Sequence, residues 1–233
     1  MKICLFGISG ITPGRHNLKD PRLDQVDELV EADRKTYAQV EVVEEKEMLN
    51  SDAILTTQTA LSDLLLKDLD AVETRLGRDP GAAEKAVLQK LAETLTSEKA
   101  VSAAGLTEEE LRAISAHNFC SHRTVVVATE AESTAPDALF LRAFKESGYI
   151  SFLTVGGKEN RAWPIREGTT AWDAAGTIHT DIQKGFIRAE IISFADCLEA
   201  GGETAAKRAG KQRLELKTYV MQDYDLVNFR FNK

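Results

Sequence analysis

Two β-prone runs, residues 149–155 and 161–165, flank the segment Gly156-Gly157-Lys158 and constrain how the last third of the chain can fold. Consecutive glycines between such runs favour a tight β-hairpin, because glycine adopts the positive φ angles that short hairpin turns require. The spacing therefore predicts two neighbouring antiparallel strands.

A helix follows the predicted hairpin. Thr170, with Asp173 three residues later, is typical of a capping box, and Gly185 suits the end of a helix that runs through Ile182. The later elements are strands at 186–194, 217–222 and 226–231, with a Gly-rich, basic helical excursion at 201–217. The order ββαβ, excursion, ββ predicts a β-grasp sheet crossed by one helix.

The first 57 residues alternate between β-like and helical patterns. Apolar runs at 2–6 and 40–43 predict strands, with Pro13-Gly14 in a turn and a helical pattern at 23–32 between them. A continuous apolar run at 124–128 predicts a strand buried on both faces. These parts favour an α/β arrangement.

Residues 59–118, between these parts, have the pattern of helices. Apolar residues recur at spacings of three and four, which predicts two helices that pair as an antiparallel hairpin across a break at 77–81. Thr107 and Glu110 predict the capping box of a third helix. The two stripes are Leu61, Leu65, Leu69, Val72 and Leu76, and then Val87, Leu88, Leu91 and Leu95.

Charge is distributed unevenly along the chain. The net charge is −8, yet residues 150–233 contain 12 Lys plus Arg against 11 Asp plus Glu, so a polyanion would meet this part first. The three cysteines are far apart, which predicts neither a disulfide framework nor a zinc site. Without a membrane-spanning run or a signal-peptide pattern, we expect a cytoplasmic protein with no membrane partner.

The tail of the chain resembles that of YchF-type Obg-like ATPases. Similarity continues upstream through residues 64–69 and 72–76 and through Asp20-Pro21-Arg22-Leu23, so it covers most of the chain, with deletions. The tail segments that carry the resemblance are Gly157–Trp163, Ala174–Asp181, Gly185–Glu190 and Phe229–Asn232.

The resemblance implies an α/β plus α+β fold. It comprises a degenerate, shortened P-loop-NTPase-like core, a helical hairpin arm and a C-terminal β-grasp (TGS-like) domain. The implied domains are 1–58 with 119–148 for the core, 59–118 for the arm and 149–233 for the TGS-like domain. In relatives this last domain is thought to contact ribosomal or transfer RNA.

The phosphate loop of the family is missing. Members have GxxxxGK[ST], in which backbone N–H groups and a lysine hold phosphates and a hydroxyl binds magnesium. The nearest approximation has one residue too few between Gly10 and Gly14, with Arg15 at the lysine position and His16 at the hydroxyl position. Histidine cannot replace the hydroxyl on magnesium, which prefers oxygen ligands.

Other nucleotide features change in the same direction. Glu44-Glu45-Lys46-Glu47 stands in place of the family's DxxG glycine, and Thr56 in place of a histidine thought to assist hydrolysis. The base-recognition NxxE becomes Thr129-Glu130-Ala131-Glu132, and threonine lacks the paired donor and acceptor of asparagine. We therefore predict no catalytic residue, no metal and no cofactor. The alternative is weak ATP or GTP binding with magnesium through Gly10, Gly14, Arg15, Thr129 and Glu132.

Basic residues in the last third are the candidates for binding RNA or a partner. A solvated surface of mixed charge, with Glu203 and Glu215 nearby, is the alternative interpretation. The candidates are Lys158, Arg161 and Arg166 near the hairpin, and Lys207, Arg208, Lys211, Arg213 and Lys217 on the excursion.

Single residues in the same region fit local roles. Trp163 and Trp172 fit core packing better than base stacking, and His179 fits a local network better than RNA contact. Tyr224 departs from the family, which usually has glycine between the flanking aspartates, so a turn that requires positive φ would be strained there.

The leading hypothesis is a non-catalytic relative of the YchF-type ATPases that binds the ribosome, tRNA or rRNA through the TGS-like domain. A weak nucleotide-binding or hydrolysing protein with a modified phosphate loop is the alternative. The arm could contact a protein partner, although packing its leucines inside the hairpin satisfies the same pattern.

Overall fold

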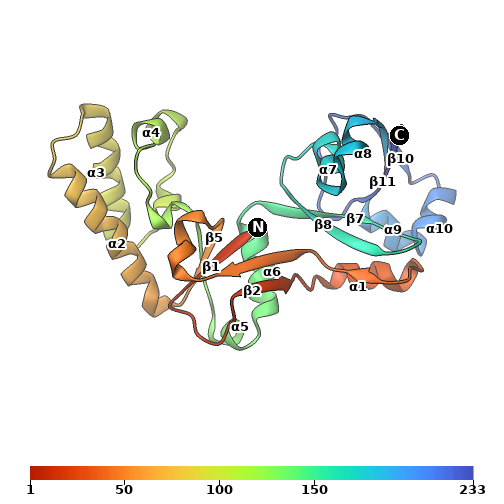
Figure 1. The fold of residues 1–233 in the computed structure, drawn as a ribbon, viewed down its shortest axis with the longest axis horizontal. Coiled ribbons are helices and arrows are strands. Elements are labelled where there is room, and N and C mark those ends of the chain that lie inside the picture. Colours follow the sequence, from red (N-terminus) through yellow and green to blue (C-terminus); the bar gives the residue numbers. More distant parts are fainter. Residues whose placement is uncertain (233) are drawn as a thin grey trace. The chain divides into compact units, whose positions relative to one another are not determined.

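The chain forms two compact units in the computed structural model, which describes residues 1–232 apart from the side chain of Ser133. Each unit has its own β-sheet, so the fold is mixed α/β with two sheets (Figure 1). The sequence assigns residues 17–39 to the first core domain, whereas their contacts place them in unit 2; the finer domain boundaries stay a prediction. Unit 1 contains Met1–His16 and Val40–Ser147, and unit 2 contains Asn17–Gln39 and the chain from Gly148 onward.

The sheet of unit 1 is centred on β1, whose residues Ile3 and Cys4 are fully buried. The strand order is β2-β4-β1-β5-β6, and β1 pairs in parallel with β4 and β5, while β6 pairs in parallel with β5. The predicted strands at 2–6 and 40–43 are confirmed. The strands are β1 (Lys2–Phe6), β2 (Gly14–Asn17), β4 (Gln39–Val43), β5 (Ala53–Thr56) and β6 (Thr124–Val127).

β6 differs from its prediction. Val126 is buried, but Thr124, Val125 and Val127 are only half-buried, so the expected burial on both faces is wrong. The reason is its position, because β6 is the last strand in the order and has a neighbouring strand on one side only.

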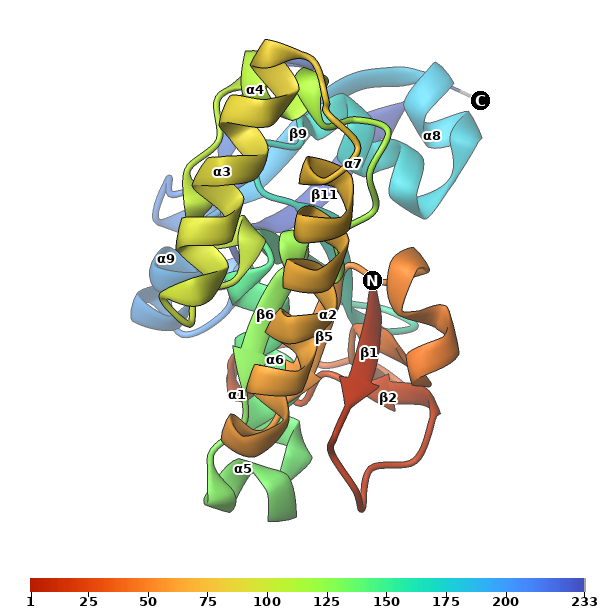
Figure 2. The same cartoon turned by 90° about the vertical axis from the view of Figure 1, so that its left-hand side faces the viewer.

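The helical arm has the predicted form. α2 and α3 pack side by side, and Val72, Leu88 and Leu91 are fully buried in their shared core (Figures 1 and 2). The capping box of Thr107 and Glu110 is present at the start of α4. The helices and 3-10 turns of unit 1 are η1 (Glu45–Asn50), α2 (Gln58–Leu76), α3 (Ala82–Thr96), η2 (Val101–Ala104), α4 (Glu108–Ala113), η3 (Cys120–His122), α5 (Glu130–Thr134) and α6 (Pro136–Glu146).

The sheet of unit 2 has the strand order β10-β9-β11-β7-β8-β3. β7 and β8 form the predicted antiparallel hairpin, β11 pairs antiparallel with β9 and in parallel with β7, and β3 adds in parallel to β8. The strands are β3 (Lys35–Thr36), β7 (Tyr149–Thr154), β8 (Asn160–Arg166), β9 (Phe186–Ile192), β10 (Arg213–Glu215) and β11 (Leu226–Phe231).

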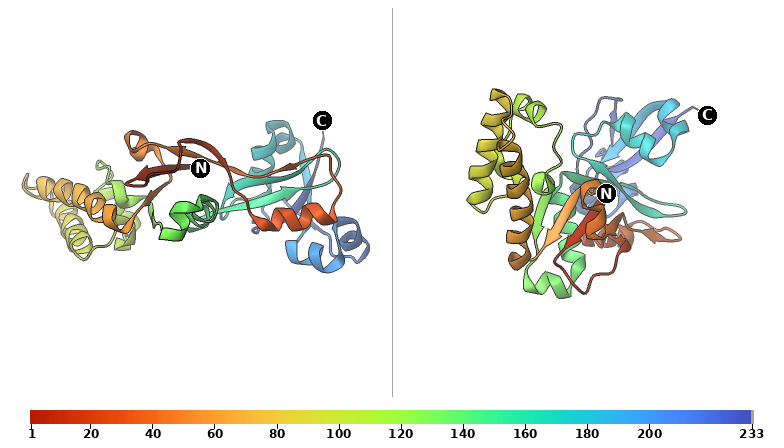
Figure 3. Two further views of the ribbon diagram at one scale, coloured as in Figure 1. Left: turned by 90° about the horizontal axis from the view of Figure 1, so that it is seen from below. Right: turned by 60° about the vertical axis from the view of Figure 1, so that its left-hand side comes forward.

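Helices cover both faces of this sheet (Figures 1 and 3). α7 packs against β8 and β9, where Ala174, Ala175, Ile191 and Phe152 are buried together. α1 contacts β8 and α9, and α10 contacts β9, on the opposite face. The helices are α1 (Pro21–Leu29), α7 (Ala171–Ile178), α8 (Thr180–Lys184), α9 (Phe194–Ala200) and α10 (Glu203–Arg208). In the part of the chain that the structure describes, no helix combines the length and apolar character that crossing a membrane requires.

Two predictions for unit 2 are wrong. The helix expected to run through Ile182 breaks at His179, whose extended backbone (φ −163°, ψ 142°) separates α7 from α8. Its Nδ1 accepts a hydrogen bond from the Asp181 N–H at 3.1 Å, which confirms the local role of this histidine.

The expected strand at 217–222 is the second error. The backbone carbonyl groups of Tyr219 and Lys217 accept hydrogen bonds from Ala171 N and Trp172 N, the first N–H groups of α7, at 2.7 and 3.3 Å. The segment therefore caps a helix instead of joining the sheet, and a single bridge links Val220 with Thr170. The strand that pairs with β9 on the side away from β11 is β10, a few residues earlier.

Candidate functional site

The segment that approximates a phosphate loop leads into a strand. In a phosphate-binding loop the chain continues into a helix, whose N-terminal N–H groups contribute to phosphate binding. Here Gly14, Arg15 and His16 lie in β2 at the edge of the sheet. Gly10 (φ 87°) and Gly14 (φ 133°) both adopt positive φ, as a turn between β1 and β2 requires.

His16 has local contacts in this turn. Its Nε2 lies 2.7 Å from the carbonyl oxygen of Thr12, and its ring centroid lies 5.0 Å from that of Phe140. Arg15, on the neighbouring position, is exposed. Arg15 and His16, at the lysine and hydroxyl positions of the family motif, therefore lie on a strand. His16 contacts its own loop, and Arg15 is open to solvent.

The end of β1 is covered by the first turn of α2. Gly7 adopts φ +67°, and a Cβ at this position would lie 2.2 Å from the Cβ of Ala60. Thr57 caps this helix by accepting a hydrogen bond from the Ala60 N–H at 3.2 Å. The carboxyl ends of parallel strands are the usual ligand sites of open α/β sheets, and here a helix packs closely on one of them. Sequence reasoning missed this contact, although a glycine directly after the first strand was a signal for it.

Thr129 and Glu132, the candidates for base recognition, form the N-terminal cap of α5. The Glu132 carboxylate accepts hydrogen bonds from the N–H and the hydroxyl of Thr129, each at 2.9 Å. Arg142 donates to both oxygens of the same carboxylate at 2.8 Å. The bound guanidinium and the hydrogen bonds from Thr129 lower the pKa of Glu132 to about 2. Both side chains thus have structural partners within unit 1.

This network predicts a pH-dependent loss of stability. A carboxyl whose pKa is lowered in the folded state stabilises the fold above its unfolded pKa of about 4.3, and loses that contribution as the pH falls toward 2. Glu132→Gln should therefore be less stable than the wild type at pH 7, and the difference should shrink at pH 3. Urea unfolding at both pH values measures it, and a difference independent of pH would contradict the assigned network.

Metal ligands are not gathered elsewhere in the described chain: residues 1–232 hold no group of three or more His, Cys, Asp or Glu side chains placed to bind one ion.

The basic candidates on the excursion fall on different elements. Lys207 and Arg208 end α10, Lys211 lies in the following turn, Arg213 lies in β10 and Lys217 follows it. Acidic side chains bind three of them: Glu203 lies 2.6 Å from Lys207, Asp196 lies 3.0 Å from Lys211, and Glu215 lies 3.3 Å from Arg213. Arg208 and Lys217 are exposed. The helical surface with five cations that the sequence suggests is therefore spread over α10, a turn and an edge strand.

The candidates near the hairpin are also separated. Lys158 is exposed in the turn, whereas Arg166 ends β8 and lies over the ring of Tyr149 at 3.9 Å. Arg161 stacks on Trp163 at 3.9 Å and lies 3.5 Å from Glu159. Trp163 packs against the core, as predicted, but Trp172 is 39% exposed, so its predicted burial is only partial.

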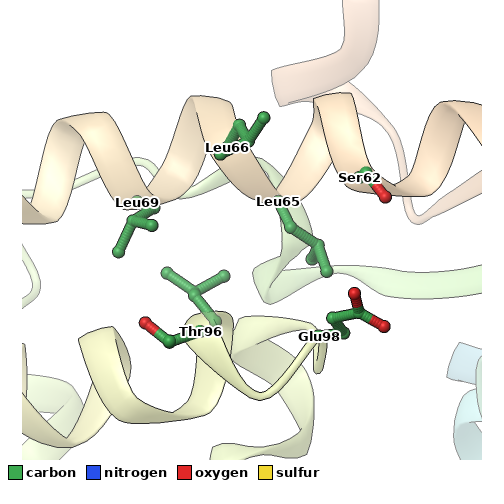
Figure 4. A pocket seen from close by; sticks show the side chains of 7 residues that line it. Ser62, Leu65, Leu66, Leu69, Thr96 and Glu98 are labelled. Atoms are coloured by element: carbon green, nitrogen blue, oxygen red, sulfur yellow. The ribbon is translucent and has the colours of Figure 1, made fainter.

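The arm carries a shallow apolar hollow of about 300 Å³ between α2 and the end of α3 (Figure 4). Leu65, Leu69 and Leu95 line it, and Leu66 beside them is 53% exposed. Leu66, beside the stripe that packs the hairpin, thus adds accessible apolar surface to the arm.

The fold defines a two-sheet α/β protein in whose first sheet β4, β1, β5 and β6 run parallel to one another. A family model named YchF-GTPase_C, described as "Protein of unknown function (DUF933)", matches residues 149–232. The "Ribosome-binding ATPase YchF" of Haemophilus influenzae is 31% identical over 243 residues, which cover 78% of this chain and 67% of the relative. The chain belongs to the YchF family of Obg-like ATPases.

Other comparisons agree with this family. The protein of the same name from Bacillus subtilis is 46% identical over 96 residues, 41% of this chain but only 26% of the relative. The structure of the Schizosaccharomyces pombe YchF GTPase is similar in fold, with a TM-score of 0.77 over 99% of this chain and 97% of that chain, at 18% identity. The alignment with the H. influenzae relative is longer than the 233 residues of this chain, so it contains gaps, as the predicted deletions require.

Proposed function

We propose that the chain is a non-catalytic YchF-family protein that binds RNA or the ribosome through unit 2. Its core is a shortened, degenerate relative of a P-loop NTPase, and its C-terminal part is a β-grasp domain of the TGS type. Its location is cytoplasmic. The arm, with its accessible leucines, is available to a protein partner.

One observation carries the non-catalytic part of this proposal. Gly14, Arg15 and His16 lie in β2, so the loop after β1 has no following helix to present N–H groups to a triphosphate. The capping role of Thr129 and its bond to Glu132 support the same conclusion, because both side chains are engaged where a base would be recognised.

The binding part of the proposal rests on the C-terminal unit. The relatives from H. influenzae and B. subtilis carry the name "Ribosome-binding ATPase", and the matching family model covers residues 149–232 of this unit. The mixed sheet crossed by α7 supports the β-grasp assignment. Of the predicted basic candidates, Lys158, Arg208 and Lys217 are exposed and remain available to phosphates.

Binding of purified ribosomes and of tRNA should therefore weaken steeply between about 50 and 200 mM salt, because bound phosphates release counterions. The double variant Arg208→Glu with Lys217→Glu should lower the affinity at least tenfold at low salt and reduce the salt slope by about two. Sedimentation with ribosomes and filter binding with tRNA measure both quantities.

The matched control changes the same charge on the arm. Arg78 and Lys85 are exposed in unit 1, and Arg78→Glu with Lys85→Glu should leave tRNA affinity within about twofold. Equal losses of tRNA affinity in the two double variants, or no binding even at low salt, would show that unit 2 is not the RNA-binding part.

The alternative is weak ATP or GTP binding with magnesium by a modified loop. The positive φ of Gly10 and Gly14 and the exposure of Arg15 favour it, since they leave backbone and guanidinium groups open to a phosphate. Titration calorimetry with magnesium–ATP and magnesium–GTP separates the two proposals. The non-catalytic proposal expects only heat of dilution, and saturable heat that Arg15→Ala abolishes would establish the alternative.

A further inference from the structure

The sheet of unit 2 opens between β7 and β11. In the described part of the chain these strands pair at one position, Leu226 with Leu153, where the Leu153 N–H donates to the Asp225 carbonyl group at 2.8 Å. β7 then ends at Thr154, whereas β11 continues to Phe231. The hairpin and β11 diverge from this point (Figures 1 and 3).

A hollow of about 600 Å³ lies in this opening, between the hairpin turn and the free edge of β11. Its size falls within the range of about 300–1,000 Å³ that ligand pockets usually have. The lining differs between the two faces of the sheet. Ile178, Ile182 and Phe229 line the face that carries α7 and α8, and Asn228 with the Glu203–Lys207 ion pair lines the face that carries α10.

The edge of β11 presents backbone groups to the hollow. Backbone groups of successive residues in a strand point to opposite sides, and the Asp225 carbonyl group points toward β7. The N–H and C=O groups of Phe229, four residues later, therefore point the same way, past the end of β7 and into the hollow. Such groups require a hydrogen-bond partner from water or from a ligand.

We propose that this opening takes an extended peptide segment of a partner protein, which adds as a strand along β11. A peptide in extended form offers backbone C=O and N–H groups that can pair with the N–H and C=O of Phe229, as in other cases of strand addition. Its side chains alternate, with apolar residues toward Ile182 and Phe229 and polar residues toward Asn228 and Lys207. The charged lining side chains are Glu159, Glu203 and Lys207. Lys207 is paired with Glu203, and Glu159 with Arg34 and Arg161, so these lining residues offer no unpaired cation to the phosphate backbone of RNA as the occupant.

A library of random octapeptides displayed on phage tests this proposal with the full chain as bait. We expect enriched peptides to carry apolar residues at every second position. Val155→Trp, which fills the opening from the hairpin, should weaken selected peptides at least tenfold, whereas Val220→Trp, on a residue 45% exposed and outside the opening, should not. The proposal would be overturned if the wild-type chain enriched no peptide that binds it more tightly than the Val155→Trp variant. Enriched peptides without apolar residues at every second position would overturn it too.

A second measurement uses the wild-type protein, so it does not depend on the folding of a variant. One selected peptide is synthesised with N-methyl groups on its odd or on its even amides. In an added strand, every second amide faces β11. Strand addition therefore predicts at least a tenfold loss of peptide affinity for one methylated set and little change for the other. Equal effects of the two sets, or displacement of the peptide by an octamer of uridine, would refute a peptide strand at this edge.

Discussion

Tyr224→Gly should lower the free energy of unfolding by about 3 kcal/mol, even though it removes an unfavourable backbone conformation. Tyr224 adopts φ 66° and is 2% exposed. Truncating a buried aromatic side chain costs about 3–5 kcal/mol, whereas the left-handed conformation of a non-glycine residue costs about 1–2 kcal/mol. Packing therefore outweighs strain, and the residue that the turn geometry would prefer is the less stable choice in this chain.

The surroundings of the ring explain this ranking. The Arg22 guanidinium lies 3.7 Å from the centroid of the Tyr224 ring, and the Phe194 ring meets it edge-on at 5.8 Å. Arg22 is held by Asp20 and Asp223, each at 2.7 Å. Burial and the nearby Asp20 raise the pKa of the Tyr224 hydroxyl well above its usual range. The ring thus links α1 to the last turn of unit 2.

Urea unfolding of the full chain measures the Tyr224→Gly effect, with Tyr224→Phe as the control. The phenylalanine variant keeps the ring and should lose only about 1 kcal/mol with the hydroxyl. A glycine variant as stable as the wild type would mean that strain dominates at this turn.

The same region shows what the sequence could not predict. Asp20-Pro21-Arg22-Leu23 was recognisable as a family segment, but its contact with the turn at 223–225 joins residues some 200 positions apart. The Asn160 amide donates to the Asp27 carboxylate and the Val30 carbonyl group at 2.8 and 2.7 Å, which fixes α1 beside β8. Both contacts join residues that are far apart in the sequence, and no pattern of neighbouring residues indicates them. Residues 17–39 could therefore not be assigned to unit 2 from hydrophobic periodicity.

Local signals were reliable where a few neighbouring residues determine the structure. The capping box at Thr107, the cap at Thr170 and the leucine stripes of the arm are all present. The strand predicted at 217–222 failed because its β-prone residues use their carbonyl groups to cap α7, and such a role depends on a helix that starts almost 50 residues earlier. For the candidate site, the sequence revealed the missing lysine and hydroxyl, but the placement of Gly14 to His16 in a strand depends on pairing with β4.

Gly7→Ala is expected to be strongly destabilising, by about 2–5 kcal/mol. The new Cβ would overlap the Cβ of Ala60, and φ +67° disfavours any side chain at this position. Overpacking contributes about 1–3 kcal/mol and the backbone conformation about 1–2 kcal/mol. The effect arises where β1 meets the first turn of α2, the position at which a phosphate loop would otherwise need space.

Ala60→Gly supplies the matched test of this contact, because it removes the methyl group that the new Cβ would strike. The double variant should be more stable than Gly7→Ala alone, by the relieved overlap less the cost of about 1 kcal/mol for glycine in a helix. The coupling in the double-mutant cycle, in which that helix cost cancels, should be about 1–3 kcal/mol. Additive losses would show that the backbone conformation alone requires glycine. A coupling of the expected size would mean that α2 packs directly on the end of β1. The helix would then occupy the space at the end of this strand that a bound nucleotide would need.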